Sequence, residues 1–216
     1  MAYEYNTNRS EDKRLEGITN EFLEKYYIPK MDEAEWVNDR DRQVRGVDII
    51  LTSAADGLDH AKTDIKSAVK YSDRYLPTYS LELSFINKGL KEQTGWLLDD
   101  RLETEYYLLL YPHSGKHYTD IKTVDDIDYI DYYLVKKADI LRFLLSRGYG
   151  KEELLDVSAS MREEYDGGSK LIRESKSENF HFSLSGNMPE KPINVVVKRR
   201  VYDRYAIKKG RITRED

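Results

Sequence analysis

Cysteine is absent from this sequence of 216 residues. A disulfide scaffold, a thiolate nucleophile and a cysteine zinc site are therefore excluded. Long apolar runs are also absent, since none approaches the roughly 18–20 residues that a membrane span needs. The first residues, MAYEYNTNRSEDKR, are polar and lack the apolar region of a signal peptide. These absences predict a soluble cytoplasmic protein without membrane contact.

Three sequence signatures of common enzyme classes are also missing. No G-x-x-x-x-G-K-[ST] motif is present, which argues against ATP hydrolysis within this chain. No G-x-S-x-G element supports a serine hydrolase. A βαβ series with a glycine-rich first turn is absent, so a dinucleotide-binding fold is not expected.

What the sequence does contain is charge, which makes up 35% of its residues. The net charge is −5, but residues 191–214 carry nine lysines and arginines against the single acid Asp203. A basic segment on an acidic body is suited to contact with a polyanion, and we select Lys198, Arg199 and Arg200 as candidate nucleic-acid contacts. The alternative is a solvated tail or helix face.

Hydrophobic periodicity predicts both helices and strands. Residues 1–14 are expected to be frayed, 15–27 helical before Pro29, and 30–43 a loop or short helix. Two short apolar runs flank the turn signal Asp56-Gly57 and predict an antiparallel hairpin. The hairpin covers 46–52 and 62–68, further strands 78–86, 90–97, 104–112, 128–134 and 180–185, and helices 137–149 and 151–165.

The predicted class is α+β or α/β, with a mixed central sheet of about five strands flanked by helices. We expect a single domain over 1–216, with a catalytic core at 15–134. Residues 135–216 would then form a helical segment, a C-terminal strand and a basic tail. Six tyrosines of the predicted strands are expected in the core or half-buried: Tyr106, Tyr107, Tyr111, Tyr129, Tyr132 and Tyr133.

The hairpin brings together the residues most indicative of chemistry. A turn centred on Asp56-Gly57 sets residue 48 opposite residue 64 or 65, so Asp48, Asp64 and Lys66 should cluster. Paired carboxylates bind Mg²⁺ or Mn²⁺, and an adjacent lysine can orient water and offset charge on a phosphate. The alternative is an edge-strand salt bridge without catalytic meaning.

The order of a helix, GVD in one strand, a turn and D-x-K in the next resembles the PD-(D/E)XK nuclease superfamily, which has the restriction-endonuclease-like fold. The chain also looks like small uncharacterised bacterial and phage members of that superfamily. The resemblance covers roughly residues 18–112 plus a C-terminal strand. It rests on RQVRGVDIIL, TDIKSAV, LPTYSLELSF, GWLLDD, TEYYLLLYP and PINVVV.

This resemblance implies Mg²⁺-dependent hydrolysis of phosphodiester bonds, in DNA rather than RNA. The expected location is the bacterial cytoplasm, or the host cytoplasm if the protein is encoded by a phage. Asp48 and Asp64 would hold the metal, and Lys66 would assist the attacking water. The sequence departs from the family at Val47, where proline is common, and at Asp64, where glutamate is common. A homodimer is left open.

Further site residues are suggested by position alone. Some branches of the superfamily supply a helical glutamate, for which Glu21 or Glu24 are candidates, and Glu82 could point toward the same site. Gln43 is a candidate DNA contact. Ordinary surface positions remain the alternative for each. A catalytically silent binding or host-interaction module with this fold, and a structural phage or assembly protein, are the competing functions.

Overall fold

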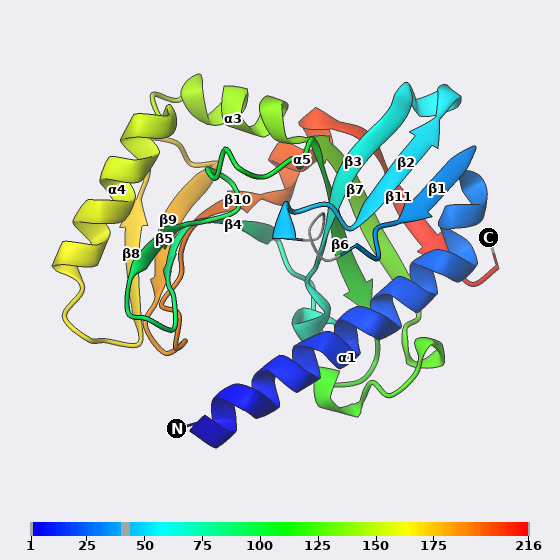
Figure 1. Cartoon of the computed structure of the whole chain (residues 1–216), viewed down its shortest axis with the longest axis horizontal. Helices are drawn as coiled ribbons and strands as arrows, with labels where there is room; N and C mark the ends of the chain where they lie inside the picture. Colours follow the sequence, from blue (N-terminus) through cyan, green and yellow to red (C-terminus); the bar gives the residue numbers. More distant parts are fainter. Residues whose placement is uncertain (1, 40–43, 216) are drawn as a thin grey trace. The chain divides into compact units, whose positions relative to one another are not determined.

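The chain alternates between two units in a computed structural model of the protein (Figure 1). It describes the backbone of residues 2–39 and 44–215 and the side chains of 10–39 and 44–215, so Gln43 lies outside the described residues. The first unit comprises residues 1–76, 104–135 and 206–216, and the second comprises 77–103 and 136–205. The structure is thus mixed α and β, as predicted.

The first unit is built on a six-stranded sheet with the order β1-β2-β3-β6-β7-β11. Its strands are β1 (Glu33–Trp36), β2 (Ile49–Ser53), β3 (Leu58–Ser67), β6 (Tyr106–His113), β7 (Tyr129–Lys136) and β11 (Ala206–Thr213). The sheet is mixed, because β3 and β6 run parallel whereas β2 pairs antiparallel with both β1 and β3. Residues on both faces of β6 are buried, as expected of a central strand.

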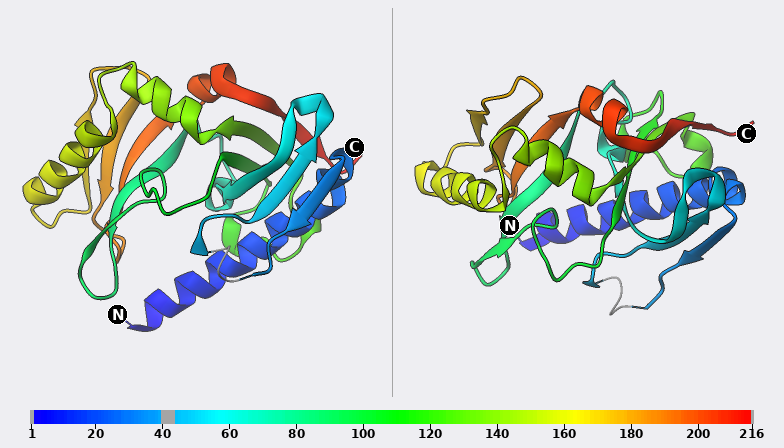
Figure 2. Two further views of the ribbon diagram at one scale, coloured as in Figure 1. Left: turned by 45° about the horizontal axis from the view of Figure 1, so that its top comes forward. Right: turned by 90° about the horizontal axis from the view of Figure 1, so that it is seen from above.

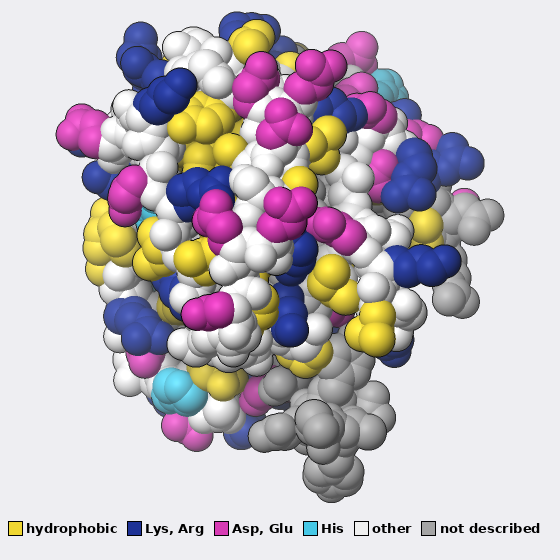
Figure 3. All heavy atoms as spheres, turned by 90° about the vertical axis from the view of Figure 1, so that its left-hand side faces the viewer, with side chains coloured by type: hydrophobic (Ala, Val, Ile, Leu, Met, Phe, Trp, Pro, Cys, Tyr) yellow, Lys and Arg dark blue, Asp and Glu magenta, His cyan; other side chains and the backbone are white. Residues whose placement is uncertain are grey.

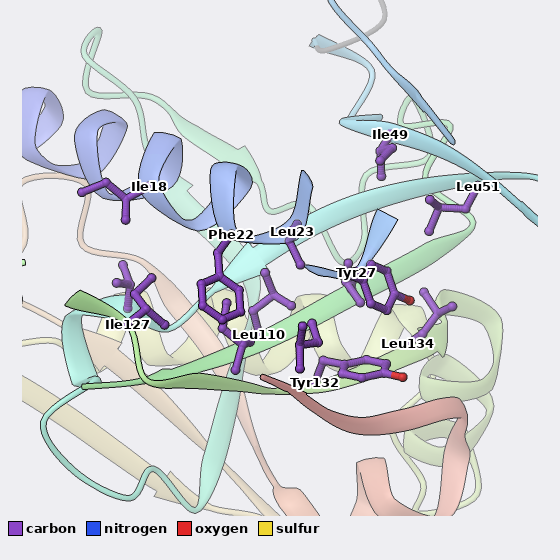
Figure 4. Packing of buried hydrophobic residues seen from close by; sticks show 14 of the residues in the cluster. Ile18, Phe22, Leu23, Tyr27, Ile49, Leu51, Leu110, Ile127, Tyr132 and Leu134 are labelled. Atoms are coloured by element: carbon purple, nitrogen blue, oxygen red, sulfur yellow. The ribbon is translucent and has the colours of Figure 1, made fainter. Parts of the chain in front are cut away.

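Helix α1 (Ala2–Tyr26) covers one face of this sheet as a continuous helix (Figure 1, Figure 2). Its apolar residues recur at helical spacing, and Figure 4 shows Ile18, Phe22 and Leu23 pointing toward the sheet. They pack in one core with Leu110 and Tyr132. Among the described residues, no helix is long and apolar enough to cross a membrane.

The predicted hairpin is confirmed, with a turn at the predicted position. A single 3₁₀ turn, Ala54–Asp56, joins β2 to β3, and Gly57 follows it in the left-handed region at φ 66°. The Asp56 carboxylate accepts hydrogen bonds from Ser53 Oγ and from Lys208 Nζ of β11. The turn is therefore held both locally and by a strand far along the chain.

Gly57→Ala should lower the free energy of unfolding by about 1 kcal/mol, because alanine is strained at positive φ. No atom lies within 4 Å of the added Cβ, so the backbone alone determines the cost. Gly17→Ala is the matched control, since its Cβ also meets nothing within 4 Å but the residue lies inside α1. It should stabilise by up to about 1 kcal/mol. Chemical denaturation measures both, and equal signs would contradict this account.

The second unit has a five-stranded sheet with the order β5-β4-β10-β9-β8, in which all pairs are antiparallel. Its strands are β4 (Thr78–Ile86), β5 (Glu92–Thr94), β8 (Lys170–Glu174), β9 (Phe180–Ser185) and β10 (Ile193–Lys198), and its helices are α3 (Lys137–Leu145), α4 (Lys151–Glu164) and α5 (Arg199–Tyr205). Phe180 contacts Phe143 of α3 edge to face, and Tyr149 packs against Phe180 and Phe182. The helices predicted at 137–149 and 151–165 are present as α3 and α4. The strands predicted at 78–86, 90–97 and 180–185 are present as β4, β5 and β9.

Several sequence predictions were wrong. The single sheet of about five strands is in fact two sheets, because β4 pairs with β10 instead of with the strands next to it in sequence in the first unit. Residues 206–213, predicted as a basic tail, form strand β11, whose charges suit an edge position. The chain also forms a strand at 33–36, and α1 begins at Ala2 instead of near residue 15.

Candidate functional site

Asp48 stands immediately before β2, and two backbone groups of β3 fix its position. Its N–H donates to the Thr63 carbonyl at 3.0 Å, and its carboxylate Oδ2 accepts from the Ile65 N–H at 2.8 Å. The register pairs Ile49 with Thr63, so residue 48 is opposite residue 64. This confirms the predicted alignment.

Asp64 and Lys66 project from the same face of β3, as the strand period predicts. Lys66 Nζ lies 2.8 Å from Asp64 Oδ1. Asp64 is 3% exposed, whereas the Lys66 side chain remains 29% exposed and can reach solvent. The lysine therefore links a buried carboxylate to the surface.

The surroundings of Asp64 disfavour the charged form of its carboxyl. Burial, joined by the nearby carboxylate of Asp48, raises the pKa of Asp64 to about 7, although Lys66 opposes the shift. Burial and the charge of Asp64 also raise the pKa of Tyr107, which pairs with Asp64 from β6. Burial is therefore the main reason that the charged forms of both side chains are disfavoured.

A third carboxylate approaches from α1. Desolvation of its carboxyl, followed by the charge of Asp48, raises the pKa of Glu16, and Lys66 partly offsets this rise. Sequence reasoning named Glu21 instead, which the structure places in an ion pair with Lys25 at 2.6 Å. Five residues separate the two glutamates, which is about 140° around the helix. Only the packing of α1 on the sheet distinguishes their faces.

The donor set is compatible with a hard divalent cation. Mg²⁺ retains several waters and takes one or two carboxylates from the protein, so the Asp48 and Asp64 pair is sufficient. Burial, with a smaller contribution from the Asp48 charge, raises the pKa of Asp64 to about 7, and a bound cation would favour the ionised form of this carboxylate. Within residues 10–39 and 44–215, no group of three or more His, Asp or Glu side chains forms a ready-made metal cage.

Of the remaining candidates, Glu24 is exposed on α1, and the others described here lie in the second unit. Glu82 is in β4. Its backbone lies close to Gly95, because a Cβ added at Gly95 would lie 2.5 Å from the Glu82 carbonyl oxygen. Lys198 is exposed at the end of β10, and Arg200 pairs with Glu178 at 2.8 Å. Arg199 is only 7% exposed, which leaves little of it accessible to a ligand.

Much of the charge in residues 191–214 is compensated within the fold. Lys208 pairs with Asp56, and Arg211 Nε lies 2.9 Å from Asp131. Arg214 donates to the Ile127 carbonyl. On the face drawn in Figure 3, lysines and arginines alternate with acidic side chains. Lys208 and Arg211 of the basic segment are thus neutralised by acids within the fold.

No family model, no curated protein and no solved structure matches this chain. Its function is accordingly argued from the arrangement of its own residues.

Proposed function

We propose that the protein is a metal-dependent nuclease of the restriction-endonuclease-like type, which hydrolyses phosphodiester bonds in nucleic acid, with DNA as the expected substrate. One observation carries the proposal: a buried carboxylate with its pKa raised to about 7, Asp64, lies between a second acid and a lysine that reaches solvent. An ordinary edge-strand salt bridge has no need of a buried acid in this position.

Each residue has a separate role in this proposal. Asp48 and Asp64 would hold Mg²⁺ or Mn²⁺, with Glu16 as a further carboxylate from α1. The Ile65 N–H fixes the orientation of the Asp48 carboxylate. When bound, the ion polarises a phosphate oxygen and lowers the pKa of coordinated water. Lys66, whose ammonium group already lies at Asp64, would orient the attacking water and offset charge on the phosphate.

Mg²⁺ should stabilise the protein against heat, and Asp48→Ala should abolish that effect. At a metal concentration about 100-fold above Kd, binding adds about 2.7 kcal/mol to the free energy of unfolding. Because protons compete for Asp64, the stabilisation should be larger at about pH 8 than at about pH 6. Glu21→Ala is the matched control and should retain the full shift. A Mg²⁺ shift that survives in Asp48→Ala would contradict the site.

The direct test is cleavage of linear, circular and single-stranded DNA and of RNA, with Mg²⁺, Mn²⁺ or EDTA. Wild type is compared with Lys66→Ala. Cleavage that requires the metal and the lysine would establish the reaction and its substrate class. A folded wild-type protein that cuts none of these substrates would contradict the proposal.

One observation favours the second candidate, a nuclease-like protein that binds nucleic acid or a host partner without cutting. Lys66 forms an ion pair with Asp64 at 2.8 Å, and this pair can stabilise the fold without any role for Lys66 in catalysis. A binding module would respond neither to Mg²⁺ nor to Asp48→Ala in the thermal measurement. The two candidates are therefore separated before any substrate is known.

A further inference from the structure

Strand β8 (Lys170–Glu174) forms one edge of the five-stranded sheet, because the sheet order β5-β4-β10-β9-β8 ends with it (Figure 1). Its pairing with β9 is regular, and neither a proline nor a bulge interrupts it. Such interruptions are among the devices that keep exposed edges from pairing with other chains. In the part of the chain that the structure describes, the outer side of β8 is therefore a straight run of backbone.

The backbone groups of alternate residues in β8 point away from β9. The Gly186 N–H donates to the Ser169 carbonyl at 2.9 Å, one position before β8 begins, so residue 169 faces β9. Hydrogen-bonded pairs alternate along an antiparallel ladder, and the odd-numbered residues of β8 therefore face β9 as well. The N–H and C=O groups of Lys170, Ile172 and Glu174 consequently point to the outer edge, where another strand can bond to them.

The side chains of β8 are divided between two faces. Arg173 lies on the face toward α4, where it pairs with Glu164 at 2.6 Å. Lys170, Ile172 and Glu174 share the other face by the strand period, and all three are exposed. Ile172, the central one, is 50% exposed. Because the contact with α4 fixes the orientation of the strand, these three side chains are held in a fixed order.

The exposed face reads lysine, isoleucine, glutamate, and this order is complementary to its own reverse. When two copies of β8 pair antiparallel about Ile172, each Lys170 lies opposite a Glu174, and the two isoleucines lie opposite each other. Directly opposed side chains have Cβ atoms about 4.5–5.5 Å apart, and opposite charges or apolar groups there stabilise the pair. The backbone matches too, since all three residues present their N–H and C=O groups at the outer edge.

The other sheet edges lack this symmetry. Strand β1 carries two acids, Glu33 and Glu35, and the charged residues of β11 are all basic. Neither strand offers an opposite charge to a second copy of itself, and like charges directly opposite each other are destabilising. Strand β5 has only three residues. Of the four edges, β8 is thus the one whose charges and apolar centre favour pairing with itself.

We propose that two copies of this chain pair antiparallel through β8, which joins their five-stranded sheets into one continuous sheet. The partner at this edge is therefore a second copy of the chain, and the inference does not depend on the proposed nuclease function. Five residues from each copy are far fewer than the roughly 20–30 residues a side of a standard interface. The dimer should accordingly be weak and form as the protein concentration rises.

Sedimentation velocity of the full-length protein tests the dimer at concentrations from about 1 µM to about 200 µM. Wild type should shift from monomer to dimer over this range. Ile172→Lys should weaken dimerisation at least about tenfold, because two ammonium groups then lie opposite each other. Leu90→Lys is the matched control, since it adds the same charge at a side chain that is 86% exposed in the second unit, and it should dimerise like wild type.

Exchanging the charges tests the register of the pairing. Lys170→Glu and Glu174→Lys should each weaken their own dimer at least about tenfold, because each sets like charges opposite each other at two positions. Mixed in equal amounts, the two variants should dimerise within about threefold of wild type, since every opposed pair then has opposite signs. Restoration also shows that both variants are folded. A wild type that stays monomeric, an unaffected Ile172→Lys variant or a mixture that stays monomeric would each overturn the inference.

Discussion

Replacing Lys66 with alanine is expected to abolish metal-dependent cleavage, lowering the rate by at least about 10²–10⁴-fold. Lys66 is the cation 2.8 Å from Asp64, and its side chain is exposed enough to reach an incoming phosphate. Removing it takes away both the group that would orient water and the charge that would oppose the developing phosphate charge. Gel-based cleavage with Mg²⁺ or Mn²⁺ measures the loss.

The variant should remain folded, which keeps the activity measurement interpretable. Without Lys66 the pKa of Asp64 rises further above its ordinary range, because burial and Asp48 then act unopposed. The carboxyl therefore takes up a proton near neutral pH instead of remaining as an uncompensated buried charge. Lys25→Ala, which breaks the exposed pair with Glu21, is the matched control and should cleave like wild type. Unchanged cleavage by Lys66→Ala would remove Lys66 from the mechanism.

The second large effect is on stability, and Asp64→Asn should reveal it. The pKa of Asp64 is raised from 3.8 to about 7, so the folded protein holds a proton that the unfolded chain has already released. The free energy of unfolding should therefore fall as pH rises from about 4 to about 7. At 1.36 kcal/mol for each tenfold change in protonation, the loss is on the order of 4 kcal/mol. Asp64→Asn should lack this pH dependence and be more stable than wild type at about pH 8.

Asp131 provides a control of opposite sign. Against the effect of burial, hydrogen bonds from His113 and Arg211 lower the pKa of Asp131 to about 2. Its contribution to stability is present above about pH 4 and is lost as pH falls from about 4 toward 2. Urea denaturation across pH should thus show Asp131→Asn less stable than wild type above about pH 4, with the difference shrinking as pH falls toward 2. A wild-type stability that is flat between pH 4 and 7 would contradict the buried, crowded state of Asp64.

The candidate site was predictable because its three residues are determined by local geometry. The turn signal at Asp56-Gly57 sets the hairpin register, and the strand period then places Asp64 and Lys66 on one face. The sequence predicted a longer loop and left residue 48 opposite either 64 or 65, and the structure has the shorter connection and the first of these registers. Periodicity likewise predicted the helical part of α1 from Leu15 onward and a buried strand at 104–112, which the structure has at 106–113, but not the start of the helix at Ala2.

The partition into two sheets was not predictable, because it depends on pairings between distant segments. Strand β4 follows β3 in sequence, yet its main partner is β10, whose pairing joins Tyr79 to Val197. Periodicity reports which face of a strand is buried but not which strand lies beside it. Glu16 was missed for the same reason, since only tertiary packing of α1 brings its carboxyl near Asp48.

The anchoring of the hairpin turn has a consequence for the order in which the protein can fold. Asp56 of the turn is held by Lys208, 152 residues later, and β3 gains its parallel neighbour only with β6. Closing such long loops costs conformational entropy before the contacts can form. The Lys208–Asp56 contact and the pairing of β3 with β6 should therefore form slowly and late in folding. During synthesis, the strand that carries Asp64 and Lys66 therefore emerges well before the contacts that hold its sheet together. An unfinished chain therefore contains the hairpin of β2 and β3 before β6 can pair with it.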